Sequence, residues 1–173
     1  MNNRVRQMTQ ASVLAALYVV LTHAQNLLFP GSASMMIQFR LSEALGVMAF
    51  ITPAAIPGLT VGCLIFNLSS AGALPFDWLV GTAATLLATL AMWKTRKLTF
   101  RGIPWLGLLM PALFNAPLVG WELAFCIAPG GFTLTVFALN ALYVFIGEAV
   151  VMLIAGAALY WAIISRGLNK RFF

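Results

Sequence analysis

Residues 37–45 of the chain read IQFRLSEAL and place Arg40 and Glu43 three residues apart in a very hydrophobic sequence. Three residues make about one helical turn, so both charges lie on one face if Ser42 opens a helix. Charge this close to a bilayer is costly. Two interpretations follow. The residues form a structural ion pair, with Glu43 favoured in the first turn, or they face the rim of a site that binds a polar solute.

The composition predicts an integral membrane protein. The chain has 173 residues, of which 62% are hydrophobic and 8% charged, whereas soluble domains carry about 25% charged residues. This length predicts a single transmembrane domain over residues 1–173. The net charge is +6. The basic residues form short clusters between apolar runs, as the positive-inside rule expects of membrane proteins, so their placement argues against nucleic-acid binding. Cys63 and Cys126 lie in different apolar segments and indicate small buried side chains, not a zinc site or a disulfide.

The apolar runs predict an all-α protein with six transmembrane helices, over about residues 8–28, 42–51, 54–68, 76–93, 104–125 and 132–165. The second is too short to span about 30 Å. The last is too long for a perpendicular span, so it must tilt or project inward. The first run also resembles a signal peptide cut after Ala24, but it continues almost to Phe29, which favours a retained helix. Prolines 111 and 117 interrupt the fifth helix.

Six helices place both termini on the cytoplasmic side. The basic clusters then fall on that side, as the positive-inside rule expects; their members are Arg4, Arg6, Lys94, Arg96, Lys97, Arg101, Arg166, Lys170 and Arg171. The polar residues within the helices converge instead on the outer half of the bundle. We take these as candidate substrate-binding residues: Arg40, Glu43, Asn67, Asp77, Asn115, Glu122, Asn140 and Glu148.

Several of these candidates also have a structural interpretation. Asp77 is placed to cap a helix, and Asn115 to form a hydrogen bond between helices. Glu122 is harder to explain structurally because a carboxylate near a helix C-terminus opposes the macrodipole. Glu148 lies within an apolar helix, where an ionisable residue indicates function. Asn140 and Glu148 are two helical turns apart, with Tyr143 between them, so the three side chains are predicted to line one wall of the binding site.

No motif indicates catalysis, so we predict that the chain is not an enzyme. It lacks a nucleophile elbow, an H-E-x-x-H motif and a second histidine. His23 is therefore expected at the interface or in a hydrogen bond rather than on a metal. There is also no G-x-x-x-x-G-K-[ST] loop to hold ATP. Aromatic residues available to stack on a flat ligand are Phe39, Trp78, Trp121 and Tyr143.

Small residues form a stripe on the inner half of the first helix, at Ala11, Ser12, Ala15 and Ala16. Such stripes allow a second helix to approach closely. That helix belongs either to this bundle or to another protein.

Four segments together resemble the QueT family: IQFRLSEAL at 37–45, PGL and GCLIFN at 57–59 and 62–67, NAPLVGWEL at 115–123, and GE at 147–148. This family consists of queuosine-precursor transporters, the substrate-binding S components of energy-coupling factor (ECF) transporters. The resemblance covers nearly the whole chain. It implies a multi-pass protein of a prokaryotic cell membrane, with a solute pocket near the outer face.

The resemblance further implies partners and a ligand. S components associate with a transmembrane coupling protein and two cytoplasmic ATPase subunits, which bind the ATP, so no cofactor is expected on this chain. Ala11 and Ala15 match the A-x-x-x-A pattern that S components use to dock the coupling protein. The implied ligand is a 7-deazaguanine base or a related queuosine compound. One carboxylate can accept the adjacent N–H groups of its guanine-like edge, and a second can pair with an aminomethyl cation.

Three other interpretations remain. The chain is an S component for thiamine, folate or another vitamin, a structural or regulatory membrane subunit whose polar cluster serves packing alone, or a membrane enzyme. A ligand bound stoichiometrically by the purified protein distinguishes a transport component from a structural subunit.

Overall fold

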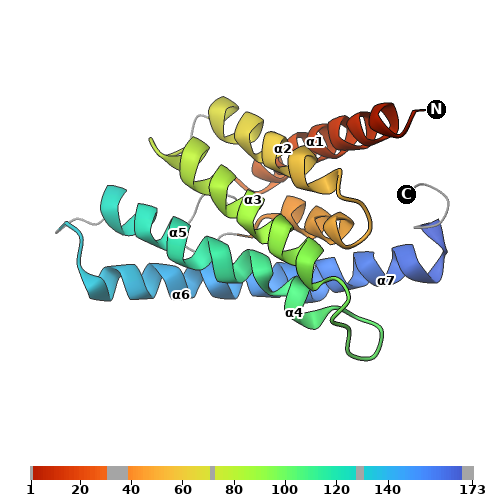
Figure 1. The fold of residues 1–173 in the computed structure, drawn as a ribbon. Coiled ribbons are helices and arrows are strands. Elements are labelled where there is room, and N and C mark those ends of the chain that lie inside the picture. Colours follow the sequence, from red (N-terminus) through yellow and green to blue (C-terminus); the bar gives the residue numbers. More distant parts are fainter. Residues whose placement is uncertain (1, 31–38, 71–72, 128–130, 169–173) are drawn as a thin grey trace.

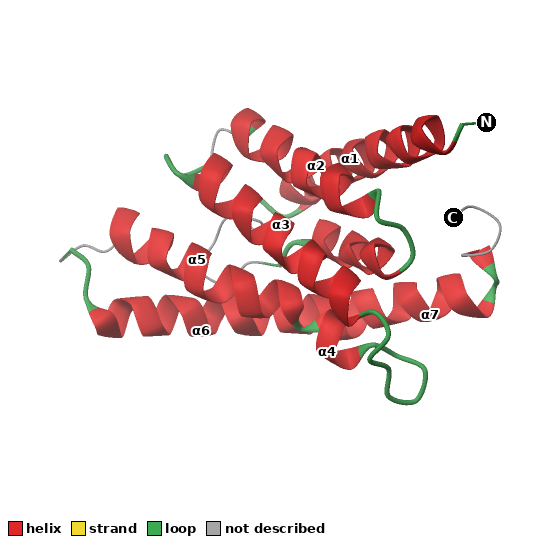
Figure 2. Ribbon diagram, in the orientation of Figure 1, coloured by secondary structure: helices red, strands yellow, loops and turns green. Residues whose placement is uncertain are grey.

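The computed structural model describes residues 2–30, 39–70, 73–127 and 131–168, and helices dominate this part of the chain (Figures 1 and 2). In chain order they are α1 (Asn3–Leu28), η1 (Leu41–Phe50), α2 (Ala55–Ser69), α3 (Asp77–Thr95), α4 (Trp105–Leu108), α5 (Met110–Cys126), α6 (Leu134–Val151), η2 (Met152–Gly156) and α7 (Ala157–Ser165). The prediction of an all-helical protein with six segments is confirmed, with α4–α5 as the fifth segment and α6–η2–α7 as the sixth.

Three of the segments are long and apolar enough to cross a membrane: Asn3–Leu28, Trp105–Cys126 and Leu134–Ser165. Two shorter apolar helices, Leu41–Phe50 and Ala55–Ser69, accompany them. The sixth segment is helical from Leu134 to Ser165, within the predicted range of 132–165, and contains a π-helical turn at Met152–Gly156. It forms the long rod along one side of the bundle in Figure 1.

The short second segment, η1, is a 3₁₀ helix of ten residues. At about 2 Å per residue it extends about 20 Å, less than a bilayer core. Runs of this length are uncommon for 3₁₀ helices, and packing on most sides supports this one: Val47 and Ala49 are fully buried. The expected opening of this helix by Ser42 is wrong. The helix begins at Leu41, and the Ser42 hydroxyl accepts a hydrogen bond from Thr22.

Close backbone contact joins α1 to α2. A Cβ atom added to Gly58 would lie 2.6 Å from the Ala11 carbonyl oxygen, and one added to Gly62 would lie 2.9 Å from that of Ala15. Only glycine allows two helices to approach this closely. Ala11 and Ala15 of the small-residue stripe therefore pack within the protein's own bundle, whereas Ser12 and Ala16 are exposed.

The predicted basic residues gather at one end of the bundle. The first turn of α1, the loop after α3 and the last turn of α7 all lie toward the same end (Figure 1). These segments carry Arg4, Lys97, Arg101 and Arg166. Two other residues predicted on the cytoplasmic side, Lys170 and Arg171, lie outside the described residues. The opposite end holds the start of α3 and the C-terminus of α5, where Asp77 and Glu122 lie.

Candidate functional site

All four acidic residues of the chain are buried. Their exposed fractions are 4% for Glu43, 4% for Asp77, 0% for Glu122 and 1% for Glu148. They come from four different elements, η1, α3, α5 and α6. Acidic side chains are rarely buried unless they are paired, so this polar cluster requires an explanation beyond packing.

Arg40 is the cation of this polar cluster and is itself 4% exposed. Its charge interacts with all four carboxylates, and its guanidinium carbon lies 5.9 Å from the centre of the Phe66 ring. The sequence suggested a pair with Glu43 alone. The structure instead makes Arg40 a shared counter-charge for the whole cluster.

Two hydroxyl groups of α1 hold the beginning of η1. The Tyr18 hydroxyl donates to Oε1 of Glu43 at 2.6 Å, and the Thr22 hydroxyl donates to Oγ of Ser42 at 2.7 Å. Tyr18 and Thr22 are almost fully buried. Neither was among the site residues chosen from the sequence.

Gln25 extends the same face of α1 and fixes the backbone on both sides of Arg40. Its amide nitrogen donates to the Phe39 carbonyl, and its side-chain oxygen accepts from the Leu41 N–H at 2.8 Å. Residues 18, 22 and 25 are four and three apart, so they form one stripe on a helix. This shared face was not recognised from the sequence, although the spacing of the three polar residues is visible there. Residues 37 and 38 of the opening motif lie outside the described residues.

Asn67 and Asp77 join the end of α2 to the beginning of α3. The Asn67 side-chain nitrogen donates to the Asp77 carbonyl at 2.8 Å, and Oδ2 of Asp77 accepts from the Leu74 N–H at 2.7 Å. Leu74 precedes α3, so the interpretation of Asp77 as a cap of that helix is wrong. The carboxylate orders the preceding turn instead.

Several buried acceptors of the cluster have no hydrogen-bond donor within the described residues: both carboxylate oxygens of Glu122, Oε2 of Glu148 and Oδ1 of Asn67. Asp77 and the Phe76 backbone are polar neighbours of Glu122, and the Asn115 side chain is a neighbour of Glu148. Leaving a buried acceptor without a donor costs about 1–3 kcal/mol, and more for a charged group. A ligand that carries several N–H groups would relieve this cost.

The remaining candidates divide into buried amides and exposed rings. Asn115 and Asn140 are each 4% exposed. Tyr143, expected between Asn140 and Glu148, is 37% exposed, so it does not complete a buried wall with them. The other rings predicted to stack on a ligand are also exposed: Phe39, Trp78 and Trp121. The buried aromatic ring beside Arg40 is that of Phe66.

His23 donates to or accepts from the Ser69 hydroxyl at 3.0 Å and packs edge-on against Phe66. The expectation of a hydrogen-bonded histidine is therefore confirmed. Within the described residues no group of three or more His, Cys, Asp and Glu side chains is arranged to hold a metal ion.

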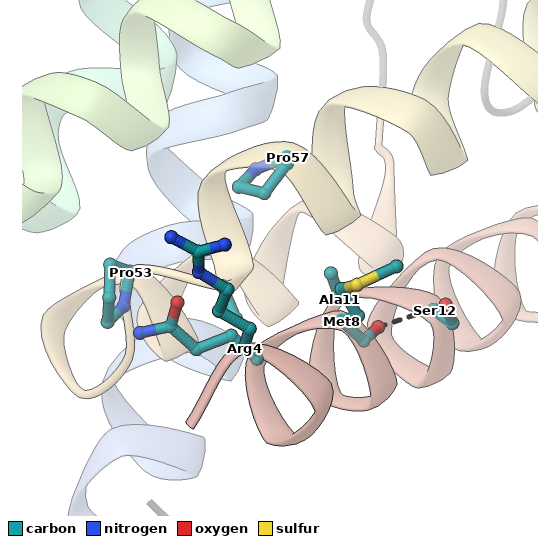
Figure 3. A pocket seen from close by; sticks show the side chains of 8 residues that line it. Arg4, Met8, Ala11, Ser12, Pro53 and Pro57 are labelled. Carbon is teal, nitrogen blue, oxygen red and sulfur yellow. Dashed lines mark hydrogen bonds between the residues drawn. The ribbon is translucent and has the colours of Figure 1, made fainter. Parts of the chain in front are cut away.

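A groove of about 540 Å³ lies at the basic end of the bundle, away from the polar cluster. In Figure 3, Arg4, Met8, Ala11 and Ser12 of α1 border it on one side, and the prolines at 53 and 57 border it on the other. Ser12 is exposed, Ala11 half-buried and Ala15 buried. Of the two alanines predicted to dock a coupling protein, the groove includes Ala11 and not Ala15.

Comparisons with known proteins agree with the resemblance seen in the sequence. The sequence profile described as QueT transporter matches residues 8–165. The chain is also 38% identical over 82 residues to the queuosine precursor transporter QueT of Lactococcus lactis subsp. cremoris strain MG1363. That match covers 44% of this chain and 43% of the relative, so it spans less than half of that protein. No solved structure matches the chain.

Proposed function

We propose that this chain takes part in nutrient uptake. The proposal starts from its membership of the QueT transporter family, which makes it a multi-pass bacterial membrane protein. In this proposal it captures a queuosine precursor, a 7-deazaguanine base or a related compound, in the outer half of the bundle. The name of the Lactococcus relative supports the ligand class.

The observation that carries the proposal is the set of buried acceptors without donors. A guanine-like base presents adjacent N–H groups on one edge, and a carboxylate can accept two of them in parallel. Glu148, with Asn115 beside it, and Glu122 each offer free carboxylate oxygens for this purpose. Packing alone does not explain these atoms, because a purely structural polar cluster would satisfy its own hydrogen bonds.

The proposal includes an external energy source. The sequence has no phosphate-binding loop for ATP, so uphill transport needs a coupled ion or another protein. The resemblance to S components of ECF transporters favours the second, with a membrane coupling protein and two ATPase subunits as partners. The groove beside Ala11 and Ser12 supports this arrangement, because it is an accessible surface at the basic, cytoplasmic end that includes these two small residues. In such a complex the chain binds the solute and the partners supply ATP hydrolysis.

The test is to purify the full chain in detergent and measure the mass of any compound released on denaturation. Calorimetry with 7-deazaguanine bases, guanine, thiamine and folate then gives relative affinities. We expect one 7-deazaguanine per chain and much weaker binding of the other three. Preferred binding of thiamine or folate would replace this ligand with a vitamin. Absence of any bound or binding heterocycle would favour a structural subunit and overturn the proposal.

A further inference from the structure

The loop between α3 and α4 carries exposed apolar and basic side chains that belong neither to the polar cluster nor to the groove. Leu98 and Phe100 are 59% and 67% exposed, and Lys97 and Arg101 beside them are exposed as well. Apolar and basic residues therefore share one short stretch, KLTFR at 97–101. The fold gives the two bulky apolar side chains little burial, so they are available to an apolar surrounding outside the chain.

A tight turn fixes the tip of this loop. The Phe100 N–H donates to the Ile103 carbonyl at 2.9 Å, and the Ile103 N–H donates back to the Phe100 carbonyl at 3.2 Å. Between them Arg101 and Gly102 have φ angles of 54° and 79°, as the two central residues of a type I′ turn do. Asparagine, aspartate or glycine suits the first of these positions best. An arginine there holds a cation at the tip at the cost of a strained backbone.

The loop lies at the side of the bundle rather than beyond its end. In Figure 1 it extends past α4 and away from the rod of α6 and α7, on the opposite side of the bundle from α1 and α2. That rod is long and apolar enough to cross a membrane, so a sideways extension at the basic end lies at the level of the lipid headgroups. Trp105 and Leu106 of the adjoining α4 are 38% and 47% exposed, and tryptophan is typical of this level.

The loop is also strongly cationic. Four basic residues fall within eight positions, and no aspartate or glutamate occurs between residues 78 and 121; the four are Lys94, Arg96, Lys97 and Arg101. All four acidic side chains of the chain are buried in the polar cluster, so they do not neutralise this surface. Two of the guanidinium groups lie near aromatic rings, with the carbon of Arg96 3.5 Å from the ring centre of Trp93 and that of Arg101 5.5 Å from that of Phe100.

We infer that the α3–α4 loop binds anionic phospholipid, with Leu98 and Phe100 among the upper acyl chains and Lys97 and Arg101 at the phosphate groups. Long basic side chains reach headgroups while their stems cover apolar surface. Each basic residue near an anionic leaflet strengthens the attraction about fivefold. The contact holds α3 and α4 at a fixed depth in the membrane. It depends neither on the solute nor on partner subunits, and a partner docked in the groove on α1 would leave it facing lipid.

The experiment measures which lipids surround the loop in the full chain. Thr99 is exposed between Leu98 and Phe100, so a fluorophore on Thr99→Cys reports on the loop and leaves the proposed contacts in place. Cys126→Ser removes the half-buried second thiol, and Cys63 is buried. The labelled protein is placed in phosphatidylcholine vesicles, and phosphatidylglycerol or phosphatidylcholine with a nitroxide near the headgroup is added. We expect phosphatidylglycerol to quench at a mole fraction at least about fivefold lower.

Two charge variants locate this preference. Lys97→Gln combined with Arg101→Gln should bring the two lipids to within about twofold of each other, because the apolar contact remains and the charge is lost. Arg4→Gln combined with Arg166→Gln is the matched control. It removes the same charge from exposed residues at the same end but outside the loop, and should leave the preference unchanged. Thermal unfolding of each variant verifies that it folds.

Each other outcome overturns the inference. Equal quenching by the two lipids in the unmodified loop would show that it does not select anionic headgroups. Quenching by neither would place the loop in water or against a protein instead of lipid. A preference lost equally in the control would assign it to the overall charge of this end of the bundle, and one that survives without Lys97 and Arg101 would assign it to other residues.

Discussion

In the outer half of the bundle, Glu122 and Glu148 retain buried acceptors without donors, whereas along the α1–α2 contact the backbones of Gly58 and Gly62 lie directly on those of Ala11 and Ala15. The first region gives up stability by burying polar atoms unpaired. The second gains stability from close packing. Both regions are buried, so burial alone does not distinguish a binding region from a structural one. The presence of unpaired polar atoms does.

The two regions also differ in how their residues depend on each other. At the close approach of α1 and α2, Gly58 faces Ala11, and Gly62 faces Ala15 and Tyr18. The polar cluster instead shares Arg40 among four carboxylates from separate elements. We therefore expect substitutions along α1–α2 to affect folding. Substitutions in the polar cluster should affect ligand binding, and their effects should depend on which other charged residues of the cluster are present.

The largest effect is expected for Gly62→Leu. Even the Cβ atom of the new side chain would lie 2.8 Å from Cβ of Tyr18 and 2.9 Å from the Ala15 carbonyl oxygen. The helices must separate, and overpacking of this kind costs about 1–3 kcal/mol or more. We expect a clear fall in unfolding temperature and loss of ligand binding. Val61→Leu, at an exposed neighbouring position, should change neither. Normal folding of Gly62→Leu would show that the two helices are not held in close contact.

The next effect is expected for Arg40→Gln, which leaves four buried carboxylates without their shared cation. Removing one partner from a buried charge network costs about 3–5 kcal/mol. Unfolding temperature and ligand affinity should both fall. Arg166→Gln, on an exposed residue at the opposite end, is the control. Adding Glu43→Gln should restore part of the stability, because it removes one uncompensated carboxylate; a double-mutant cycle measures this coupling. Additive losses would contradict a shared counter-charge.

Tyr18→Phe should have a smaller effect. It removes the 2.6 Å hydrogen bond to Glu43 and leaves that buried oxygen without this donor, at a cost of about 1–3 kcal/mol. Chemical denaturation measures the change in the free energy of unfolding. Tyr160→Phe is a matched control, since Tyr160 packs by its ring against Phe50. Equal stability of the two variants would show that the Tyr18 hydroxyl does not support the cluster.

The sequence predicted the features that follow from residue type and spacing. The charged residues Arg40, Glu122 and Glu148 were placed in the outer half from the expected order of the helices, and a functional role for Glu148 was predicted because an ionisable residue in an apolar helix is rarely incidental. The presence of the helices was predicted from the long apolar runs in the sequence. The 3₁₀ geometry of η1 was not predicted, because it depends on packing from neighbouring elements rather than on local preference.

Residues whose roles depend on a partner distant in sequence were the ones missed. Tyr18 and Gln25 look like ordinary residues of an apolar helix until η1 is placed beside them. The exposed rings of Trp121 and Tyr143 were equally ambiguous, since an aromatic residue near a membrane surface serves either lipid or ligand. For Ala15, the sequence left open whether its neighbour was internal, and the partner proves to be Gly62.

The smallest effect on the isolated protein is expected for Ser12→Trp, which tests the groove as a docking surface. Ser12 is exposed, borders the groove and bonds only back to the Met8 carbonyl at 3.0 Å in the described contacts. A tryptophan there should fill the groove without entering the α1–α2 contact. Ala15→Trp is a poorer probe, because the bulk would press on Gly62 and unfold the bundle. We therefore expect ligand affinity of Ser12→Trp to stay within about twofold of wild type, a free-energy change of about 0.4 kcal/mol.

The same substitution should abolish co-purification with a coupling protein and ATPase subunits, and with it ATP-dependent uptake. Val20→Trp is the matched control, on the same helix and exposed like Ser12, but not part of the groove; it should leave assembly unchanged. If Ser12→Trp still assembles and transports normally, the groove is not where the partner docks. If it loses ligand binding instead, Ser12 contributes to the packing that shapes the polar cluster, and the separation between a binding half and a docking half is wrong. Loss of assembly with binding retained is the one result that requires two independent surfaces on this chain.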